Sequence, residues 1–205
     1  MSSDTPSSYR PRPPGEAQPW WSLLLDRQVL LGLVAAAVLG AVYLVADRKG
    51  FSLGAAAAPQ GEFALEPVDG LRGRNGLPLP GITQRDLRGA VSVVNVWAAW
   101  CPYCRSEHAT LMAFSQDARV RVLGVTYRDT PENIRDYLAK AGVPYDALGH
   151  DPDGRMSKAL GVRGVPTTFV LDRNGQVVRA MAGAMDPGRV KRELLPAIDD
   201  ALARR

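Results

Sequence analysis

Cysteine, histidine and aromatic residues are scarce in this chain. Its 205 residues include two cysteines and two histidines, and aromatic side chains make up 7% of the total. Structural zinc sites usually need four Cys or His ligands, often as two separated pairs, and only one Cys pair is present. This scarcity disfavours a zinc-binding class and leaves the role of the single pair of thiols as the main question.

Excess charge of one sign is also absent. The formal net charge is +4, and no run of lysine and arginine alternates with aromatic residues. Because nucleic-acid-binding surfaces need such a basic stripe, we expect no nucleic-acid partner. A net charge this small is also too weak to indicate an anionic substrate.

One long hydrophobic run does occur, from Val29 to Ala46, with eighteen residues and no charge. At 1.5 Å per residue a helix of this length spans about 27 Å, close to the thickness of the hydrocarbon core of a bilayer. The run is longer than the apolar part of a signal peptide, about 7–15 residues, and the small residues of Ala55–Ala58 lie beyond several charges. We therefore expect an uncleaved membrane anchor.

This run divides the chain into four expected segments. They are a disordered cytoplasmic tail (1–27), a transmembrane anchor (28–46), a linker (47–61) and a folded domain (62–205). The tail is rich in Ser, Pro and Arg and has no apolar period, and the linker is rich in Gly and Ala. The basic residues flanking the span are balanced, so placing the folded domain outside depends on the single, export-like N-terminal span.

The two cysteines lie in the sequence Trp100-Cys101-Pro102-Tyr103-Cys104. An apolar run, 91–97, precedes them as a predicted buried strand, and a helical apolar pattern follows. Residues three apart lie on one helical face, so the first cysteine is expected at the helix N-terminus and the second one turn inside. Free N–H groups and the helix dipole favour a thiolate there. This pattern predicts Cys101 as nucleophile and Cys104 as the resolving thiol that closes a Cys101–Cys104 disulfide.

Two other interpretations of the cysteines remain open. A purely structural disulfide across so short a loop would restrict the unfolded chain little. A metal site could combine both cysteines with His108, and His150 is a conceivable fourth ligand. Covalent haem attachment requires histidine directly after the second cysteine, and Arg105 occupies that position.

The folded domain alternates strands and helices, which predicts an α/β fold with a mixed central sheet flanked by helices. A parallel pair joined by a helical crossover should be completed by an antiparallel hairpin and a last helix. The expected strands are 91–97, 120–126, 168–171 and 176–181, with a short edge strand at 63–65 and weak pairing at 145–148. The expected helices are 102–115, one from 131 to about 141, a short one at 156–160 and a last one from 186, while 70–89 is mostly loop.

A proline stands directly before the 168–171 strand, in Gly164-Val165-Pro166-Thr167. Proline at the mouth of a central strand is unusual unless it serves a bend. A cis-proline turn beside the cysteines could present backbone groups to a bound polypeptide. An ordinary trans proline is the alternative, and the rarity of cis bonds favours it on sequence alone.

Three segments together resemble a known family. They are Leu77–Thr83 followed by Asp86-Leu87, Asn95–His108 around the cysteines, and Gly161–Gly175. On these segments the chain resembles the thioredoxin superfamily, and within it the membrane-anchored thioredoxin-like proteins of cytochrome c maturation (the CcmG/DsbE type). The resemblance implies a thioredoxin fold, a cis bond at Pro166 and a single-pass protein of the inner membrane whose folded domain faces the periplasm.

The resemblance also implies a task and partners. The task is thiol–disulfide oxidoreduction that keeps the cysteines of apocytochrome c C-x-x-C-H sites reduced, directly or through a companion thiol protein. Electrons would come from a membrane donor of the CcdA or DsbD type, and no cofactor or metal is expected. Residues flanking the cysteines and the proline are expected to contact the substrate; they are Trp100, Pro102, Tyr103, Val165, Pro166 and Thr167.

Glu107, three residues after the second cysteine, is a third catalytic candidate. General thioredoxins carry a buried Asp where this chain has Asn95, so a buried proton acceptor must come from elsewhere. Near the thiols, Glu107 would disfavour a second negative charge and could relay a proton. A solvated helix residue is the alternative.

Two departures from the family pattern affect the predicted direction of electron flow. Thr167 stands where family members usually carry Glu, and Arg163 stands where they often carry Tyr. More positive charge stabilises a thiolate and makes the disulfide more oxidising. A disulfide-forming oxidase or general thiol exchanger is therefore an alternative function, and a non-catalytic binding module is another.

Overall fold

The computed structural model describes residues 31, 34 and 63–204. The predicted tail, anchor and linker, residues 1–61, lie outside the described residues except for Leu31 and Val34, which are helical and exposed. In the described part of the chain, no helix is both long enough and apolar enough to cross a bilayer.

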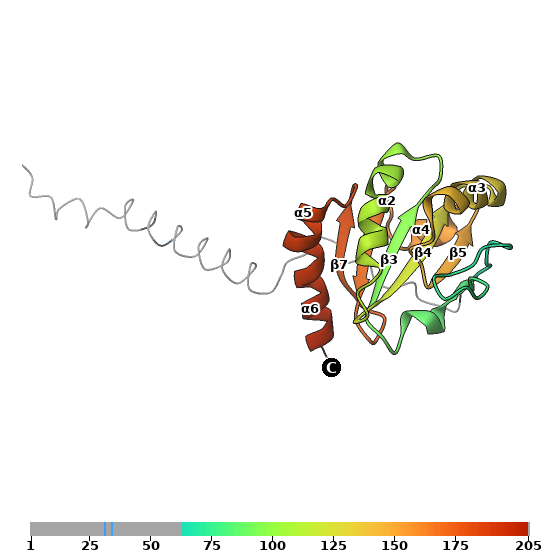
Figure 1. The fold of residues 1–205 in the computed structure, drawn as a ribbon. Helices are drawn as coiled ribbons and strands as arrows, with labels where there is room; N and C mark the ends of the chain where they lie inside the picture. Colours follow the sequence, from blue (N-terminus) through green and yellow to red (C-terminus); the bar gives the residue numbers. More distant parts are fainter. Residues whose placement is uncertain (1–30, 32–33, 35–62, 205) are drawn as a thin grey trace, which may run out of the picture. The chain divides into compact units, whose positions relative to one another are not determined.

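A five-stranded mixed sheet in the order β5-β4-β3-β6-β7 forms the centre of the domain (Figure 1). The strands are β3 (Ser92–Trp97), β4 (Arg121–Tyr127), β5 (Ala147–Asp151), β6 (Thr167–Leu171) and β7 (Val177–Ala182). β3 pairs in parallel with β4, and β4 with β5, while β6 pairs antiparallel with both β3 and β7. The predicted mixed sheet is confirmed. The 145–148 stretch, expected to pair only weakly, leads into a full parallel edge strand.

Two of the described helices, those beginning at Pro131 and Pro187, start directly after a side-chain cap. α2 (Pro102–Phe114), α3 (Pro131–Ala141), α4 (Arg155–Ala159), α5 (Pro187–Arg189) and α6 (Leu195–Ala203) follow the strands, with a π-helical turn, Val190–Leu194, before α6. Thr130 accepts a hydrogen bond from the Asn133 N–H at the start of α3, and Asp186 accepts one from the Arg189 N–H at the start of α5. Side-chain oxygens at these positions satisfy N–H groups that a helix leaves unpaired.

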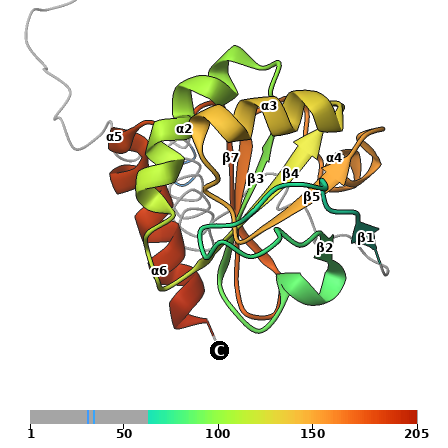
Figure 2. The ribbon, with the colours of Figure 1, turned by 45° about the vertical axis from the view of Figure 1, so that its right-hand side comes forward.

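The core has one layer on each face of the sheet. Because β3, β4 and β5 follow one another in one direction, right-handed crossovers place α2 and α3 on the same face, and α6 covers that face too (Figures 1 and 2). Val93 and Trp97 of β3 point into this layer. Val94 and Val96 point into the other layer, with α4 and the N-terminal segment. The alternation follows from the period of two along a strand.

The N-terminal segment covers the outer edge of the sheet. Its strands, β1 (Ala64–Leu65) and β2 (Ile82–Thr83), form a separate two-stranded sheet, and a 3-10 turn, Gln84–Leu87, follows. The expected strand at 63–65 thus forms but does not join the central sheet. Carbonyl groups of Glu66 and Pro80 instead accept the outward N–H groups of β5, which protects an otherwise open sheet edge.

Candidate active site

Cys101 is the N-cap residue of α2, in an extended conformation (φ −84°, ψ 117°), and Pro102 follows at the first helical position. Its Sγ accepts a hydrogen bond from the Cys104 N–H at 3.2 Å. Both cysteines are free thiols and both are buried, each 3% exposed. The predicted placement of the first sulfur at the positive end of a helix, with the second one turn inside, is confirmed.

The environment of Cys104 keeps its thiol protonated. Burial raises the pKa of this thiol well above its ordinary value, and the neighbouring Cys101 and the charge of Glu107 raise it further. A thiol in this state attacks only when a base removes its proton, because the thiolate is the nucleophile. This behaviour suits the resolving role predicted for Cys104.

The proline loop lies against the first cysteine. The Val165–Pro166 peptide bond is cis, so the trans alternative that the sequence alone favoured is wrong and the conformation implied by the resemblance is confirmed. The Val165 carbonyl oxygen lies 3.6 Å from the Cys101 Sγ. Thr167 is buried, and its hydroxyl donates to the Gly164 carbonyl at 2.7 Å within the same loop.

The other predicted substrate-contacting residues are exposed around the cysteines. Pro102 is exposed, and Trp100 and Tyr103 expose 51% and 70% of their surface. Exposed aromatic side chains of this kind are common at sites that bind polypeptides. The Trp100 indole N–H donates to the Arg128 carbonyl at 3.1 Å, which fixes the ring beside the thiols.

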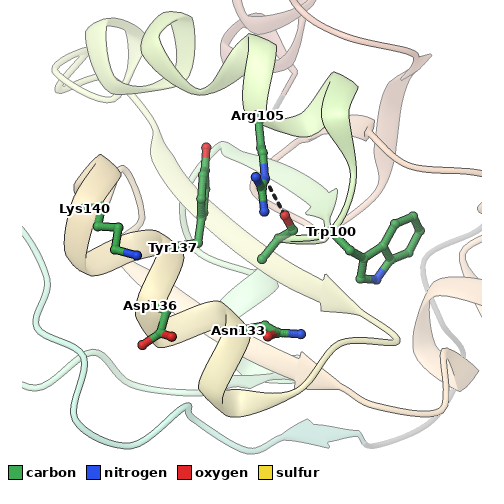
Figure 3. Close-up of a pocket in the computed structure, with 7 residues that line it drawn as sticks. Trp100, Arg105, Asn133, Asp136, Tyr137 and Lys140 are labelled. Atoms are coloured by element: carbon green, nitrogen blue, oxygen red, sulfur yellow. Dashed lines mark hydrogen bonds between the residues drawn. The ribbon is translucent and has the colours of Figure 1, made fainter.

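Two shallow hollows flank the site. The first, of about 260 Å³, lies between α2 and α3 (Figure 3); its lining is Ala99, Trp100, Arg105, Asn133, Asp136, Tyr137 and Lys140. There the Arg105 Nε donates to the Ala99 carbonyl at 2.6 Å and the guanidinium lies 5.5 Å from the centre of the Tyr137 ring. The second, of about 340 Å³, follows the proline loop, 160–167, and the end of β7.

Glu107 is held in a buried hydrogen-bond network. It is 1% exposed, its Oε1 accepts from the Asn95 Nδ2 at 2.9 Å, and its Oε2 accepts from the Met185 N–H at 2.8 Å. The amide of Asn95 also donates to the Thr168 hydroxyl at 3.2 Å and accepts from the Tyr145 hydroxyl at 2.9 Å. The alternative of a solvated Glu107 is therefore wrong.

Burial sets the proton affinity of this carboxyl group. Loss of solvent raises the pKa of Glu107, and the hydrogen bonds from Met185 and Asn95 and the charge of Arg189 oppose the rise. A buried carboxyl group with a raised pKa binds a proton more readily than an exposed one, which suits a proton acceptor. The structure thus places Glu107 on the same helix as Cys104, where its charge acts on that thiol.

Several members of this network were missed by sequence reasoning. The sequence marks Asn95 only as an uncharged residue in place of the usual Asp. It does not link Tyr145, Thr168 or Met185 to that position. One signal was present: Asn95 stands in a fully buried strand, Ser92–Trp97, and a buried amide needs partners for its donors and acceptor. That signal predicts a network but not which residues join it.

The two histidines lie in other environments. The His108 Nε2 lies 3.2 Å from the Gly142 carbonyl, and its ring meets Tyr137 edge-on at 5.1 Å. The His150 Nε2 lies 3.0 Å from the Asp129 carbonyl. Within residues 31, 34 and 63–204, no group of three or more His, Cys, Asp or Glu side chains is placed to hold a metal ion.

The fold and the paired thiols define a thioredoxin-fold thiol–disulfide oxidoreductase. A profile of the Redoxin family matches residues 79–197, and the chain belongs to this family, within its CcmG/DsbE-type members. It is 39% identical over 117 residues to the thiol:disulfide interchange protein HelX of Rhodobacter capsulatus, covering 57% of this chain and 66% of that one.

A second relative supports this assignment, and a solved structure supports the fold. The chain is 36% identical over 141 residues to the thiol:disulfide interchange protein DsbE of Escherichia coli K12, covering 67% of this chain and 71% of that one. A crystal structure of a DsbE-like protein from Chlorobium tepidum superposes with a TM-score of 0.53 at 24% identity, over 69% of this chain and 96% of that one. The superposition supports the fold.

Proposed function

We propose that the protein is a membrane-tethered reductant of cytochrome c biogenesis. It would reduce the cysteines of apocytochrome c C-x-x-C-H sites, or of a companion thiol protein, on the periplasmic side of the inner membrane. The observation that carries the chemistry is the Cys101 sulfur, which caps α2 next to the Val165–Pro166 loop. The client and the compartment come from the family resemblance and from the apolar run at 28–46.

The proposed reaction moves two electrons and two protons. The Cys101 thiolate attacks one sulfur of the substrate disulfide, and a mixed disulfide forms while the other substrate sulfur leaves as a thiolate and takes up a proton. Cys104 then gives its proton to a base, attacks the Cys101 sulfur and releases the second substrate sulfur as a thiol. The substrate disulfide is reduced to a dithiol, and the protein dithiol is oxidised to a disulfide.

Glu107 is the base that we assign to this second step. Burial is the main cause of the raised pKa of Cys104 and the charge of Glu107 is a minor one, while burial also raises the pKa of Glu107 itself. A proton passing from Cys104 to Glu107 removes one negative charge as another forms, so the buried site never holds two full charges.

The same electrostatics support the reducing direction. Thioredoxin and DsbA differ by about 150 mV, or roughly 7 kcal/mol for two electrons, and the oxidant is the one whose thiolate is stabilised. Here burial, with smaller contributions from Cys101 and the charge of Glu107, raises the pKa of Cys104, so this thiol supplies none of the thiolate stabilisation that makes DsbA an oxidant. Thr167 is one of the two departures from the family pattern that made an oxidase an alternative. Its hydroxyl donates a hydrogen bond to the Gly164 carbonyl within its own loop.

Electrons would reach the oxidised protein from a membrane thiol–disulfide transporter of the CcdA or DsbD type. The anchor at 28–46 would hold the domain near such a donor. Tethering raises the effective concentration of the two proteins and needs no large docking surface.

Three measurements test the proposal. The reduction potential of the full chain, by equilibration with glutathione, should lie near the thioredoxin end of about −270 mV, and a value near the DsbA end of about −120 mV would contradict the reducing direction. Cys101→Ser should abolish reduction of insulin disulfides and keep the folded circular dichroism spectrum. Residual activity in that variant would remove Cys101 as the nucleophile, and loss of the gene without loss of holocytochrome c would remove the proposed client.

A further inference from the structure

The segment 182–185, between β7 and α5, contacts both halves of the active site. The Gly183 N–H donates to the Pro166 carbonyl at 2.9 Å, and the Met185 N–H donates to the Glu107 Oε2 at 2.8 Å. One short segment therefore holds both the proline loop and the buried carboxylate.

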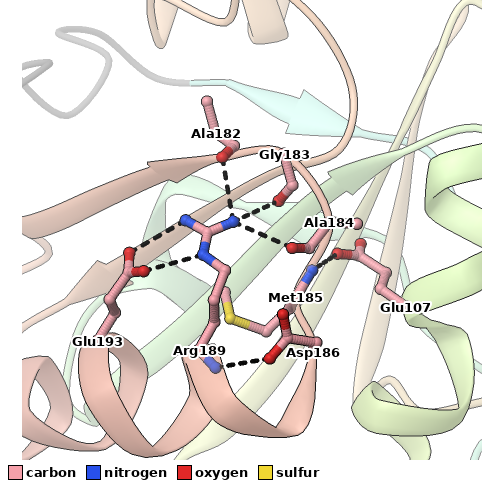
Figure 4. A network of polar contacts seen from close by, with 8 residues as sticks. All are labelled: Glu107, Ala182, Gly183, Ala184, Met185, Asp186, Arg189 and Glu193. Carbon is pink, nitrogen blue, oxygen red and sulfur yellow. Dashed lines mark hydrogen bonds and ion pairs between the residues drawn. The ribbon is translucent and has the colours of Figure 1, made fainter.

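Arg189 forms hydrogen bonds to the opposite side of this segment (Figure 4). Its Nη1 donates to the carbonyl oxygens of Ala182, Gly183 and Ala184 at 3.2, 3.2 and 3.0 Å. Its Nε and Nη2 donate to the two carboxylate oxygens of Glu193 at 2.9 and 3.0 Å. A guanidinium suits this task because its five N–H groups form a rigid planar fork.

The contacts on the two sides of the segment share peptide units. The Ala182 carbonyl and the Gly183 N–H belong to one peptide, and the Ala184 carbonyl and the Met185 N–H belong to another. In a planar trans peptide the C=O and N–H bonds point in opposite directions. Holding the two carbonyls toward Arg189 therefore aims the two N–H groups at the active site. A positive charge on the carbonyl side also polarises each peptide and strengthens its N–H as a donor.

We propose that Arg189 is a positioning residue which, through these two peptide units, holds the Glu107 carboxylate and the Pro166 loop in place beside the thiols. The polar partners of the Arg189 side chain are Glu193 and the three backbone carbonyls, and neither sulfur is among them. The proposal rests on the dithiol chemistry proposed above. It adds Arg189, a residue outside the Cys101–Cys104 motif, as one that positions the groups around the thiols.

The pKa of the Glu107 carboxyl group can report whether Arg189 holds the segment 182–185 in place. The titratable and charged groups that act on it are Cys104 on its own helix, Tyr137 on α3, Tyr145 before β5 and Arg189 on α5, with the neutral amide of Asn95 on β3. Against the rise from burial, the Met185 N–H, the Asn95 amide and the charge of Arg189 lower the pKa of Glu107. Loosening the segment should therefore raise that pKa.

The test is an NMR titration of the full chain, reduced and labelled with 13C-glutamate, with the Glu107 signal assigned by Glu107→Gln. Arg189→Met and Arg189→Lys should both shift the inflection upward by about half a pH unit, or about threefold in proton affinity. Lysine keeps the charge but loses the fork. Glu193→Gln removes the ion-pair partner, keeps the three carbonyl contacts and should not raise the inflection.

Three outcomes would overturn the proposal. An unchanged inflection in Arg189→Lys would mean that charge alone acts. Lower melting temperatures in both Arg189 variants without any shift would mean that Arg189 only stabilises the fold. An equal rise in Glu193→Gln would assign the effect to the ion pair. The titration needs no substrate, so it is independent of the client, and Cys101→Ser tests the proposed reaction separately.

Discussion

Replacing Asn95 with aspartate places a second carboxyl group against Glu107. The two residues are 0% and 1% exposed, and the atoms concerned are 2.9 Å apart. Two carboxylates at that distance in a buried site cannot both ionise, so they share one proton and titrate as a pair. The Tyr145 and Thr168 hydroxyls can still bond to the introduced group, so the substitution changes mainly the charge.

The magnitude follows from proton linkage. Above the folded pKa of Glu107 the wild-type carboxyl group is ionised in both the folded and unfolded states, and its contribution to stability no longer changes with pH. In Asn95→Asp the folded pair still holds a proton that the unfolded chain has released. The free energy of unfolding of the variant should therefore keep falling relative to wild type, by about 1.4 kcal/mol for each pH unit, or about 3 kcal/mol over two units.

Urea unfolding of both proteins between pH 5 and pH 9 measures this difference, and titrations common to both cancel. At the acid end the shared proton replaces the amide N–H, and the variant should be close to wild type. Asn75→Asp is the matched control, because Asn75 is exposed and its Oδ1 accepts a bond from the Leu77 N–H that a carboxylate keeps. A stability difference that stays constant with pH, as in the control, would refute the buried Asn95–Glu107 contact.

Three further predictions address the network, the packing and the chemistry. Tyr145→Phe leaves the buried Asn95 Oδ1 without its 2.9 Å donor and should lower the free energy of unfolding by about 1–3 kcal/mol, measured by urea unfolding. Gly124→Ala would place a Cβ 2.6 Å from the Leu148 Cδ1 and 2.9 Å from the Tyr145 Cγ and should cost about 1–3 kcal/mol, seen as a lower melting temperature. Cys104→Ser should accumulate mixed disulfides, visible as reducible adducts on non-reducing gels, since the resolving thiol is gone; a variant that turns over normally would contradict that role.

The sequence predicts the order of elements well because local rules determine them. The buried run before Cys101, the proline in the first turn of α2 and the Thr130 cap each specify an element boundary without reference to the rest of the chain. Pairing is different: β1 and β2 lie far apart in sequence, and their separate sheet depends on how Glu66 and Pro80 meet the edge of β5.

The candidate site likewise has one part that local sequence rules predict and another that depends on the folded chain. Cys104 and Glu107 lie on α2 with Cys101 as its N-cap residue, and their spacing of three already places neighbouring members on one side of the helix. Arg189 lies 82 positions after Glu107, and it acts through backbone carbonyls that any residue supplies, so no side-chain pattern marks it. Its role becomes visible only when the path of residues 182–185 is known.

The position of the acid on α2 instead of on β3 has a consequence for the thiols. Asn95 supplies an N–H to Glu107 and so favours the ionised carboxylate, whereas a carboxyl group at that place would compete for the same proton. The Met185 N–H acts in the same sense from the opposite side. Together these two donors keep the pKa of Glu107 from rising as far as burial alone would raise it. In the proposed mechanism, residues outside the Cys101–Cys104 motif therefore influence when the second thiol can react.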